Sequence, residues 1–430
     1  MTMGMPEADT IYALSSGQPP AAIAIVRISG PDALAAAGEL SSAKLEPRRP
    51  RLIALRHQGD LLDNALALFF PGPNSSTGED TVELHLHGGR AVVNAVLAAL
   101  AGNPRLRAAE PGEFTRRSFA NGRIDLAEAE GLADLLAAET EAQRRSAMLL
   151  AGGALSREVH GWTDRLLVLA AAVEALLDFS DEGDVDEGLP EQWHLDLARF
   201  MAELEDALER PSAERLRDGV RVVLAGPPNA GKSTLLNRLV GREAAITHEV
   251  AGTTRDLIEA PVVIGGLPFL LIDTAGLRSS EDEVEAIGVD RARAALEAAD
   301  MVLWLGPRDE SPQHHDAICV RSRRDIQPLD INGDFHVSGV TGEGVEDLVA
   351  EILRRAGNML PATGEAALHA RHRQAVGEAL GALRGAGANL DLLIVAEELR
   401  RARSRLDRIT GRAGVEDMLD TLFGRFCIGK

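Results

Sequence analysis

The fold of this chain is decided by the stretch Gly226-Pro227-Pro228-Asn229-Ala230-Gly231-Lys232-Ser233-Thr234. It matches G-x-x-x-x-G-K-[ST], the phosphate-loop (P-loop) pattern, at every fixed position. Residues 221–225 before it are aliphatic and β-branched, which predicts a buried strand, and residues 233–239 carry leucines at helical spacing. A strand, a glycine-rich loop and a helix in this order point backbone N–H groups at one place, where they bind phosphate. We therefore expect Lys232 to reach the β- and γ-phosphates of a nucleotide and the Ser233 hydroxyl to bind Mg²⁺.

Two further stretches follow at the distances that a nucleotide-hydrolysing switch domain requires. Asp273-Thr274-Ala275-Gly276 comes directly after the apolar run 269–272, a second candidate strand. A carboxylate at the end of that strand can hold Mg²⁺ through water, and the Gly276 N–H can meet a γ-phosphate. The polar loop Ala251-Gly252-Thr253-Thr254-Arg255-Asp256 lies between, with Thr254 able to reach the metal. Together with the P-loop, these stretches predict a Ras-like domain.

Length and composition limit the remaining classes. The chain has 430 residues, of which 45% are hydrophobic, so there is room for two or three domains with real cores. No apolar run approaches the roughly 18–20 residues of a membrane span, and the N-terminus has no basic and apolar leader. Only Cys319 and Cys427 occur, which is typical of a reducing cytoplasm. The formal net charge of −21 restricts any nucleic-acid contact to local basic patches.

The periodicity along the chain predicts four segments. Residues 1–121 read as an α+β domain of short strands and turns, and residues 122–217 change to helical spacing. Residues 218–360 form the nucleotide domain, and helical spacing resumes over residues 361–430. Because helical patterning stands on both sides of the nucleotide unit, we expect one helical domain with an inserted P-loop domain. The predicted fold class is multidomain, α/β and α.

A histidine pair and an arginine cluster each allow two interpretations. His85 and His87 share one strand face and could bind a metal, but without a third ligand nearby a packed or solvent-facing pair is the favoured reading. Arginines 400, 401, 403, 405 and 408 favour a charged helix face, since Glu397 and Glu398 precede them, with an RNA contact as the sharper alternative.

Several motifs outside the nucleotide domain carry a specific resemblance. They are Val26-Arg27-Ile28-Ser29-Gly30, Phe70-Pro71-Gly72-Pro73-Asn74-Ser75, Thr77-Gly78-Glu79-Asp80, Pro111-Gly112-Glu113-Phe114-Thr115, Asp125-Leu126-Ala127-Glu128-Ala129-Glu130 and the terminal Phe426-Cys427-Ile428-Gly429-Lys430. With the P-loop, they make the chain resemble the MnmE (TrmE) family over essentially its whole length. The terminal Cys-x-Gly-Lys is the most specific of them.

The resemblance implies a GTPase that acts in modifying the wobble uridine of transfer RNA, adding a carboxymethylaminomethyl-type group at C5. It implies an N-terminal domain that binds a reduced folate of the 5,10-methylenetetrahydrofolate type and forms a homodimer. It also implies an FAD-containing partner of the MnmG type, with which a heterotetramer forms. The folate positions correspond here to Arg27, Glu83, Arg123 and Lys430, and Arg123 replaces the usual lysine. Cys427 corresponds to a cysteine near the folate.

The water-orienting group of hydrolysis must come from an unusual place. Leu277 stands where Ras-like enzymes have a glutamine, and a leucine cannot hydrogen-bond water. The resemblance assigns this role to Glu285 and assigns the role of an arginine finger to a potassium ion. The ligands of that ion correspond to Asn229, Thr253 and backbone oxygens near His248 and Val250.

The base-recognition motif departs from its usual Asn-Lys-x-Asp form. Here it reads Ser322-Arg323-Arg324-Asp325, which keeps the carboxylate that accepts two guanine N–H bonds but loses the amide. We expect guanine selection with weakened affinity, Arg323 stacking on the base, and Ser338 in the loop that supports it. The predicted nucleotide-binding residues are Asn229, Ala230, Gly231, Lys232, Ser233, Thr234, Thr253, Thr254, Asp273, Thr274, Ala275, Gly276, Asp325 and Ser338.

Two other functions compete with the enzyme. A ribosome-assembly or regulatory GTPase would act only as a switch, and a degenerate scaffold would bind nucleotide without turnover. A pure switch needs neither the N-terminal motifs nor the terminal Cys427-Ile428-Gly429-Lys430, so these favour the modification enzyme.

Overall fold

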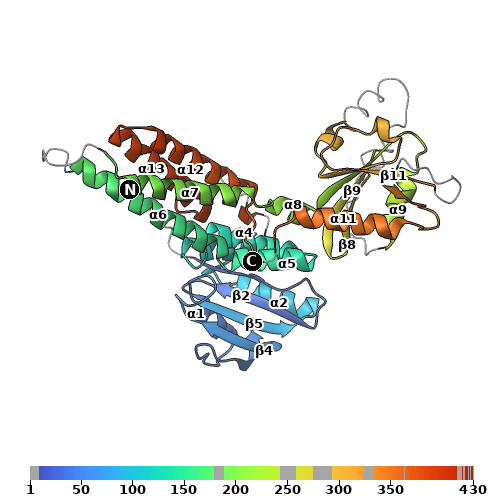
Figure 1. The fold of residues 1–430 in the computed structure, drawn as a ribbon. Coiled ribbons are helices and arrows are strands. Elements are labelled where there is room, and N and C mark those ends of the chain that lie inside the picture. The colour runs from blue at the N-terminus through green and yellow to red at the C-terminus, as the bar shows by residue number, and fades with distance from the viewer. Residues whose placement is uncertain are drawn as a thin grey trace, which may run out of the picture. The chain divides into compact units, whose positions relative to one another are not determined.

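The computed structural model of the chain describes residues 9–178, 188–242, 258–274, 293–323, 333–362, 364–413, 419, 422–424, 426 and 428–429. The chain forms two compact units (Figure 1). The first consists of Met1–Ala133 and Asp407–Lys430, and the second of Asp134–Leu406. Within the described ranges, no helix combines the length and apolar character that crossing a membrane requires.

The first unit is built on a six-stranded sheet in the order β3-β4-β5-β2-β1-β6. β1 and β6 are parallel, and the other pairs are antiparallel. The strands are β1 (Thr10–Leu14), β2 (Ile23–Ser29), β3 (Arg51–His57), β4 (Asp60–Phe70), β5 (Thr81–His87) and β6 (Leu106–Ala108), and the helices are α1 (Ala33–Leu40), α2 (Arg90–Ala101) and α3 (Glu113–Ala120). The α+β character predicted for residues 1–121 is confirmed.

Period-two alternation decides which side chains this sheet buries. Val26, Ile28 and Leu84 belong to the core that α1 and α2 share with the sheet. Arg27 and Glu83 alternate with them, face the other way and stay partly accessible. One face of the sheet therefore forms the main core of the unit, and Arg27 and Glu83 lie on the other face.

The C-terminal segment completes the first unit. Ile428 forms an antiparallel bridge with Pro111. Gly112 has a φ of +69°, and a Cβ there would lie 2.2 Å from the Phe423 oxygen. A Cβ on Gly429 would lie 2.0 Å from the Leu14 oxygen. These approaches leave no room for a side chain, so both glycines are required where the tail docks.

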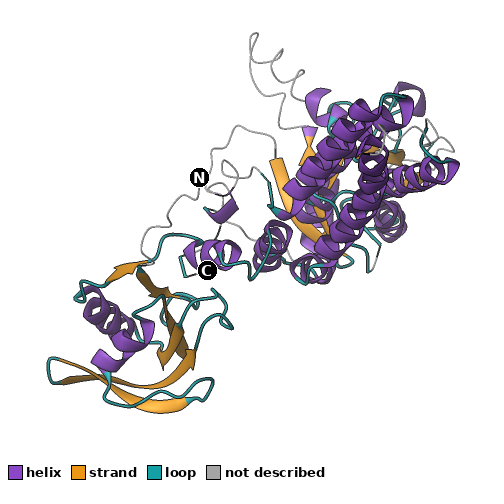
Figure 2. Ribbon diagram, turned by 90° about the vertical axis from the view of Figure 1, so that its left-hand side faces the viewer, coloured by secondary structure: helices purple, strands orange, loops and turns teal. Residues whose placement is uncertain are grey.

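The helical part of the second unit buries aromatic and aliphatic side chains. Helices are drawn in purple in Figure 2. Leu166, Leu169 and Val173 are buried, which confirms the predicted periodicity. Trp193 donates a hydrogen bond of 3.0 Å from Nε1 to the Leu169 oxygen and so fixes α7 against α6. The helices are α4 (Leu126–Ala137), which crosses the division between the units as α13 does, α5 (Glu141–Ala151), α6 (Ala154–Asp178), α7 (Glu191–Glu209), α8 (Ala213–Asp218), α12 (Ala370–Ala388) and α13 (Leu392–Thr410).

The nucleotide domain is a second six-stranded sheet, in the order β12-β11-β10-β7-β9-β8. Only β8 and β9 pair in antiparallel fashion. Its elements are β7 (Val220–Ala225), α9 (Lys232–Arg242), β8 (Ile258–Ile264), β9 (Leu267–Asp273), β10 (Met301–Trp304), β11 (Ala317–Arg321), β12 (Phe335–His336) and α11 (Val345–Met359). Because β7, β9, β10 and β11 run parallel, the loops at their carboxyl ends meet along one edge, where such sheets bind ligands. The strands predicted before the P-loop and before Asp273 are confirmed, as is the helix after the P-loop.

Candidate functional site

The P-loop connects β7 to α9, as its sequence predicts. Gly226 has a φ of +146°, and a Cβ there would lie 2.9 Å from the Leu305 oxygen, so a larger residue does not fit. Gly231 has a φ of +92° and Asn229 a φ of +58°. Glycine adopts such angles without cost, and asparagine tolerates them better than most residues. The loop conformation therefore depends on these residue types.

Lys232, the first residue of α9, places its charge inside the loop. Its side chain is buried, and Nζ donates hydrogen bonds to the oxygens of Gly226 at 3.0 Å and Pro227 at 2.9 Å. The ammonium group and the N-terminus of α9 both favour an anion at the same place. This arrangement fits the β- and γ-phosphates of a nucleoside triphosphate.

Two oxygen-bearing side chains meet beside the cradle. Asp273 at the end of β9 is completely buried, and its Oδ2 accepts a hydrogen bond of 2.5 Å from the Ser233 hydroxyl. Thr274, the next residue, donates to the Leu224 oxygen at 2.9 Å and so anchors the end of β9 to β7. A hydroxyl and a carboxylate are hard oxygen donors of the kind that Mg²⁺ prefers. Ser233 would bind the ion directly, and Asp273 would hold it through water, where it neutralises phosphate charge.

The loop after β11 also reaches the P-loop. Ser322 donates from its hydroxyl to the Ala230 oxygen, and Arg323 donates from Nη2 to the Asn229 oxygen at 2.5 Å. Ser338 is completely buried, and its hydroxyl accepts the Thr341 N–H at 3.0 Å, which shapes the following turn. The sequence indicated these positions as base-recognition residues, but it gave no sign that 322 and 323 contact the main chain of the P-loop.

Several predicted site residues lie outside the described part of the chain. In the nucleotide domain these are His248, Val250, Thr253, Thr254, Ala275, Gly276, Glu285 and Asp325, and at the C-terminus Cys427 and Lys430. Their roles remain predictions. Those that the structure does bring together are Asn229, Ala230, Gly231, Lys232, Ser233, Thr234, Asp273, Thr274 and Ser338, all in the nucleotide domain.

In the first unit, the structure pairs two of the predicted folate residues. Arg27 donates to Glu83 Oε1 from Nε at 3.0 Å and from Nη2 at 2.8 Å, and its guanidinium carbon lies 5.6 Å from the centre of the Phe114 ring. Arg123 runs beside the 77–80 loop, where its Cγ would be 3.3 Å from a Cβ on Gly78. His85 contacts Glu83 at 3.5 Å and His87 contacts Asp63 at 2.7 Å, and the described residues contain no group of three metal ligands.

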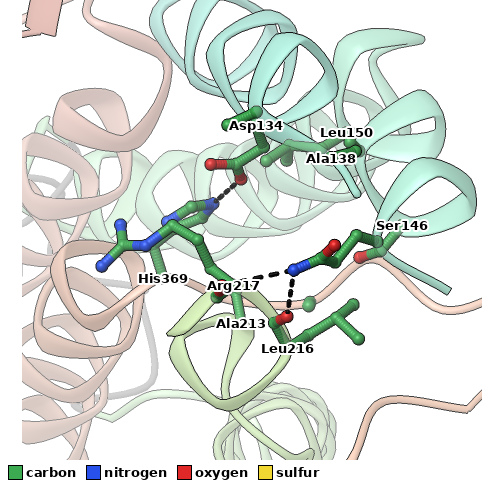
Figure 3. A pocket seen from close by; sticks show the side chains of 12 residues that line it. Asp134, Ala138, Ser146, Leu150, Ala213, Leu216, Arg217 and His369 are labelled. Atoms are coloured by element: carbon green, nitrogen blue, oxygen red, sulfur yellow. Dashed lines mark hydrogen bonds and ion pairs between the residues drawn. The ribbon is translucent and has the colours of Figure 1, made fainter. Parts of the chain in front are cut away.

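A small cavity in the second unit shows polar contacts that the sequence analysis missed (Figure 3). Gln143 donates from Nε2 to the Leu216 oxygen at 3.0 Å and the Arg217 oxygen at 3.3 Å, so it caps α8, the helix that leads into β7. His369 Nε2 lies 2.9 Å from Asp134 Oδ2. The cavity holds about 30 Å³, enough for a water molecule but for no nucleotide. The Thr140-x-x-Gln143 capping box was a readable signal for one end of this network.

The parallel sheet, the P-loop and the Ser233–Asp273 pair define a P-loop nucleoside triphosphatase. The family model of the MnmE helical domain matches residues 126–427, and that of the GTP-binding protein TrmE N-terminus matches residues 10–123. The chain belongs to the MnmE family of tRNA modification GTPases, and it is a GTP-hydrolysing enzyme. The resemblance read from the terminal motifs is confirmed.

Named relatives cover nearly the whole chain. Proteins named tRNA modification GTPase MnmE are 59% identical in Rhizorhabdus wittichii and 56% identical in Erythrobacter litoralis, covering 99% and 98% of this chain and 98% and 100% of their own lengths. The relative from Novosphingobium aromaticivorans is 53% identical over 98% of this chain and 100% of its own length. Identity of this extent assigns GTP as the nucleotide of this chain and transfer RNA as its substrate class.

Proposed function

We propose that this enzyme uses GTP hydrolysis to drive addition of a carboxymethylaminomethyl-type group to C5 of the wobble uridine, together with an FAD-containing partner of the MnmG type and a reduced folate. One observation carries the proposal. The C-terminal segment that contains Cys427 belongs to the same compact unit as Arg27 and Glu83, through the Ile428–Pro111 bridge and the close approach of Gly429 to Leu14. A GTPase that acts only as a switch does not need its C-terminal residues to pack in the unit that contains Arg27 and Glu83.

The residues on the open face of the first sheet fit a folate. The Glu83 carboxylate accepts N–H groups, which the aminopyrimidine ring of a folate offers, and Arg27 and Arg123 are cations suited to its carboxylates. Lys430 and Cys427 are added to the proposed folate site because the family resemblance assigns them there. A bound 5,10-methylenetetrahydrofolate supplies a one-carbon unit. The Cys427 thiol would then act on that unit or on the uridine ring, since C5 of uridine needs activation before it reacts.

Potassium is the proposed cation of the hydrolytic site. Asn229 is exposed in the P-loop and has a φ of +58°. Its amide oxygen, Thr253 and backbone oxygens near His248 and Val250 would bind the ion. A monovalent cation there offsets charge that develops on the phosphate oxygens. Leu277 cannot hydrogen-bond the attacking water, so Glu285 would orient it. Asp325 would select guanine.

A homodimer through the first unit is supported by the face of the sheet that α1 and α2 do not cover. Leu52, Ile23 and Leu66 are 71%, 59% and 38% exposed on this face. Apolar side chains grouped in this way are typical of protein–protein contacts. Two copies of this chain and two copies of the FAD-containing partner would form the proposed heterotetramer. The presence of only two cysteines in 430 residues favours a reducing cytoplasm.

The test is nucleoside analysis of transfer RNA. A strain without this gene should lose the modified wobble uridine that its parent contains, and a plasmid copy of the full chain should restore it. A copy with Lys232→Ala should fail to restore it, because the phosphate cradle loses its cation. If the deletion strain keeps its full content of modified uridine, the enzyme is a regulatory GTPase and the proposed function is wrong.

A further inference from the structure

The main chain of the P-loop is tied to the loop after β11 by two consecutive side chains. Ser322 donates to the Ala230 oxygen and Arg323 to the Asn229 oxygen, the latter at 2.5 Å. The loops run close together, since a Cβ on Gly231 would lie 3.4 Å from the Ser322 hydroxyl. Two adjacent carbonyl groups of the P-loop thus have side-chain partners from the same dipeptide.

Both residues of the Arg323–Asn229 contact have unusual backbones. Arg323 has a φ of +63° and Asn229 a φ of +58°. A residue with a Cβ is strained in this left-handed region, and such conformations persist where surrounding contacts fix them. The hydrogen bond joins the two strained positions directly, so each helps to hold the other.

A hydrogen bond that fixes a backbone carbonyl also fixes the direction of the N–H group of the next residue. In a planar trans peptide, the C=O of one residue and the N–H of the next point in opposite directions. Holding the Asn229 and Ala230 oxygens on the side of Ser322 and Arg323 therefore turns the Ala230 and Gly231 N–H groups to the other side. The Ala230 N–H makes only a long contact of 3.4 Å with the Pro227 oxygen, and no hydrogen bond from the Gly231 N–H occurs among the described residues.

We propose that Ser322 and Arg323 are positioning residues for phosphate binding: they hold the 229–231 main chain so that its N–H groups face the nucleotide phosphates. In this role the serine hydroxyl and the arginine guanidinium replace the asparagine and lysine of the usual base-recognition motif. Although Ser322 and Arg323 depart from the usual motif, they preserve the geometry of the P-loop. This role is separate from any effect on base binding. The inference depends on GTP binding by the family and on neither potassium nor folate.

The experiment separates phosphate binding from base binding by comparing GDP with GMP. Both carry guanine, but only GDP places a β-phosphate in the cradle. Ser322→Ala and Arg323→Ala should each weaken GDP binding about two- to twelvefold, the effect of one net hydrogen bond. GMP affinity should stay at the wild-type value. Ser322→Thr keeps the hydroxyl and should bind GDP as the wild type does. Arg323→Lys keeps the charge but replaces the planar fork by a single ammonium nitrogen, so its GDP affinity should lie between.

Arg308→Ala is the matched control, because Arg308 is an exposed arginine of the same domain whose ion pair with Asp334 is remote from the P-loop in sequence. It should leave both affinities unchanged. Equal weakening of GDP and GMP in Arg323→Ala would show that Arg323 contacts the base and would overturn the proposal. Unchanged GDP affinity in both alanine variants would overturn it as well. Circular dichroism of each full-length variant confirms folding, and the Ser322→Ala and Ser322→Thr pair decides the question if Arg323→Ala does not fold.

Discussion

The Ser233 hydroxyl donates a hydrogen bond of 2.5 Å to Oδ2 of Asp273, joining the start of α9 to the end of β9. The two residues are forty positions apart in sequence, and the parallel pairing of β7 with β9 brings them together. This pair is the part of the site that fits Mg²⁺, and its carboxylate is completely buried.

Asp273→Asn should reduce the apparent Mg²⁺ affinity of GTP hydrolysis by about 10- to 100-fold, the usual effect of losing a partner in the outer shell of a metal. The amide keeps the size of the side chain and removes its charge. A Mg²⁺ titration of the hydrolysis rate measures the effect. Asp309→Asn, at an exposed position outside the site, is the control. A wild-type Mg²⁺ dependence in Asp273→Asn would separate this carboxylate from the metal.

Hydrolysis should be about tenfold or more faster in KCl than in NaCl at equal ionic strength, because a fitted cation stabilises developing phosphate charge. Asn229→Gly removes the ligand while accepting the φ of +58°, so it should abolish the difference between the two salts. Asn229→Asp keeps an oxygen and should retain part of it. Equal rates of the wild type in both salts would contradict the potassium proposal.

Gly112→Ala should loosen the C-terminal segment, and Gly122→Ala should not. Both glycines have a positive φ, +69° and +65°, so the backbone strain of about 1–2 kcal/mol is common to both variants. Only at Gly112 would the new Cβ meet another segment, 2.2 Å from the Phe423 oxygen, whereas nothing lies within 4 Å at Gly122. We expect faster proteolysis of the tail and loss of wobble modification in Gly112→Ala alone. Matching behaviour of the two variants would show that the tail does not depend on this approach.

Glu113 should stabilise the first unit at neutral pH and not in acid. Burial by itself would raise the pKa of Glu113, but hydrogen bonds from Arg107, the Glu110 N–H and Arg117 outweigh it and lower the pKa. A carboxyl whose folded pKa is lowered stabilises the fold above its unfolded pKa of about 4.3 and loses this contribution as the pH falls through the folded value.

The corresponding variant is Glu113→Gln. It should destabilise the unit by about 1–3 kcal/mol at pH 7, since charged hydrogen bonds are lost. Hydrogen exchange of β1 and α3 in the full chain reports this locally, and the difference from wild type should shrink below pH 4. A constant difference across that range would assign the effect to packing.

Cys427→Ser should leave GTP turnover close to the wild-type rate and abolish wobble modification in cells. Position 427 falls within the residue range of the first unit, whereas the P-loop residues belong to the second. GTP hydrolysis by the purified variant and nucleoside analysis of complemented cells measure the two effects. Full modification by the serine variant would make Cys427 a packing residue, the common role of a free cysteine.

The sequence alone determined the elements that depend on local pattern. The P-loop needs glycine at 226 and 231 and a cationic side chain at 232, so its spacing predicts strand, loop and helix without knowledge of anything distant. The helical spacing over residues 122–217 likewise predicts helices from local pattern alone. The terminal Cys-x-Gly-Lys identified the family through residue identities and without any geometry.

Only the tertiary structure decided which distant residues act together. Ser322 and Arg323 look like weakened base-recognition residues in the sequence, but the parallel sheet places β11 two strands from β7 and brings both side chains onto P-loop carbonyls. The docking of the C-terminal tail on Pro111 and Gly112 likewise depends on the close approach of two main chains, and periodicity carries no information about it. Local patterns fix secondary structure because they act over one or two turns of chain, whereas these contacts arise from sheet topology and packing across hundreds of residues.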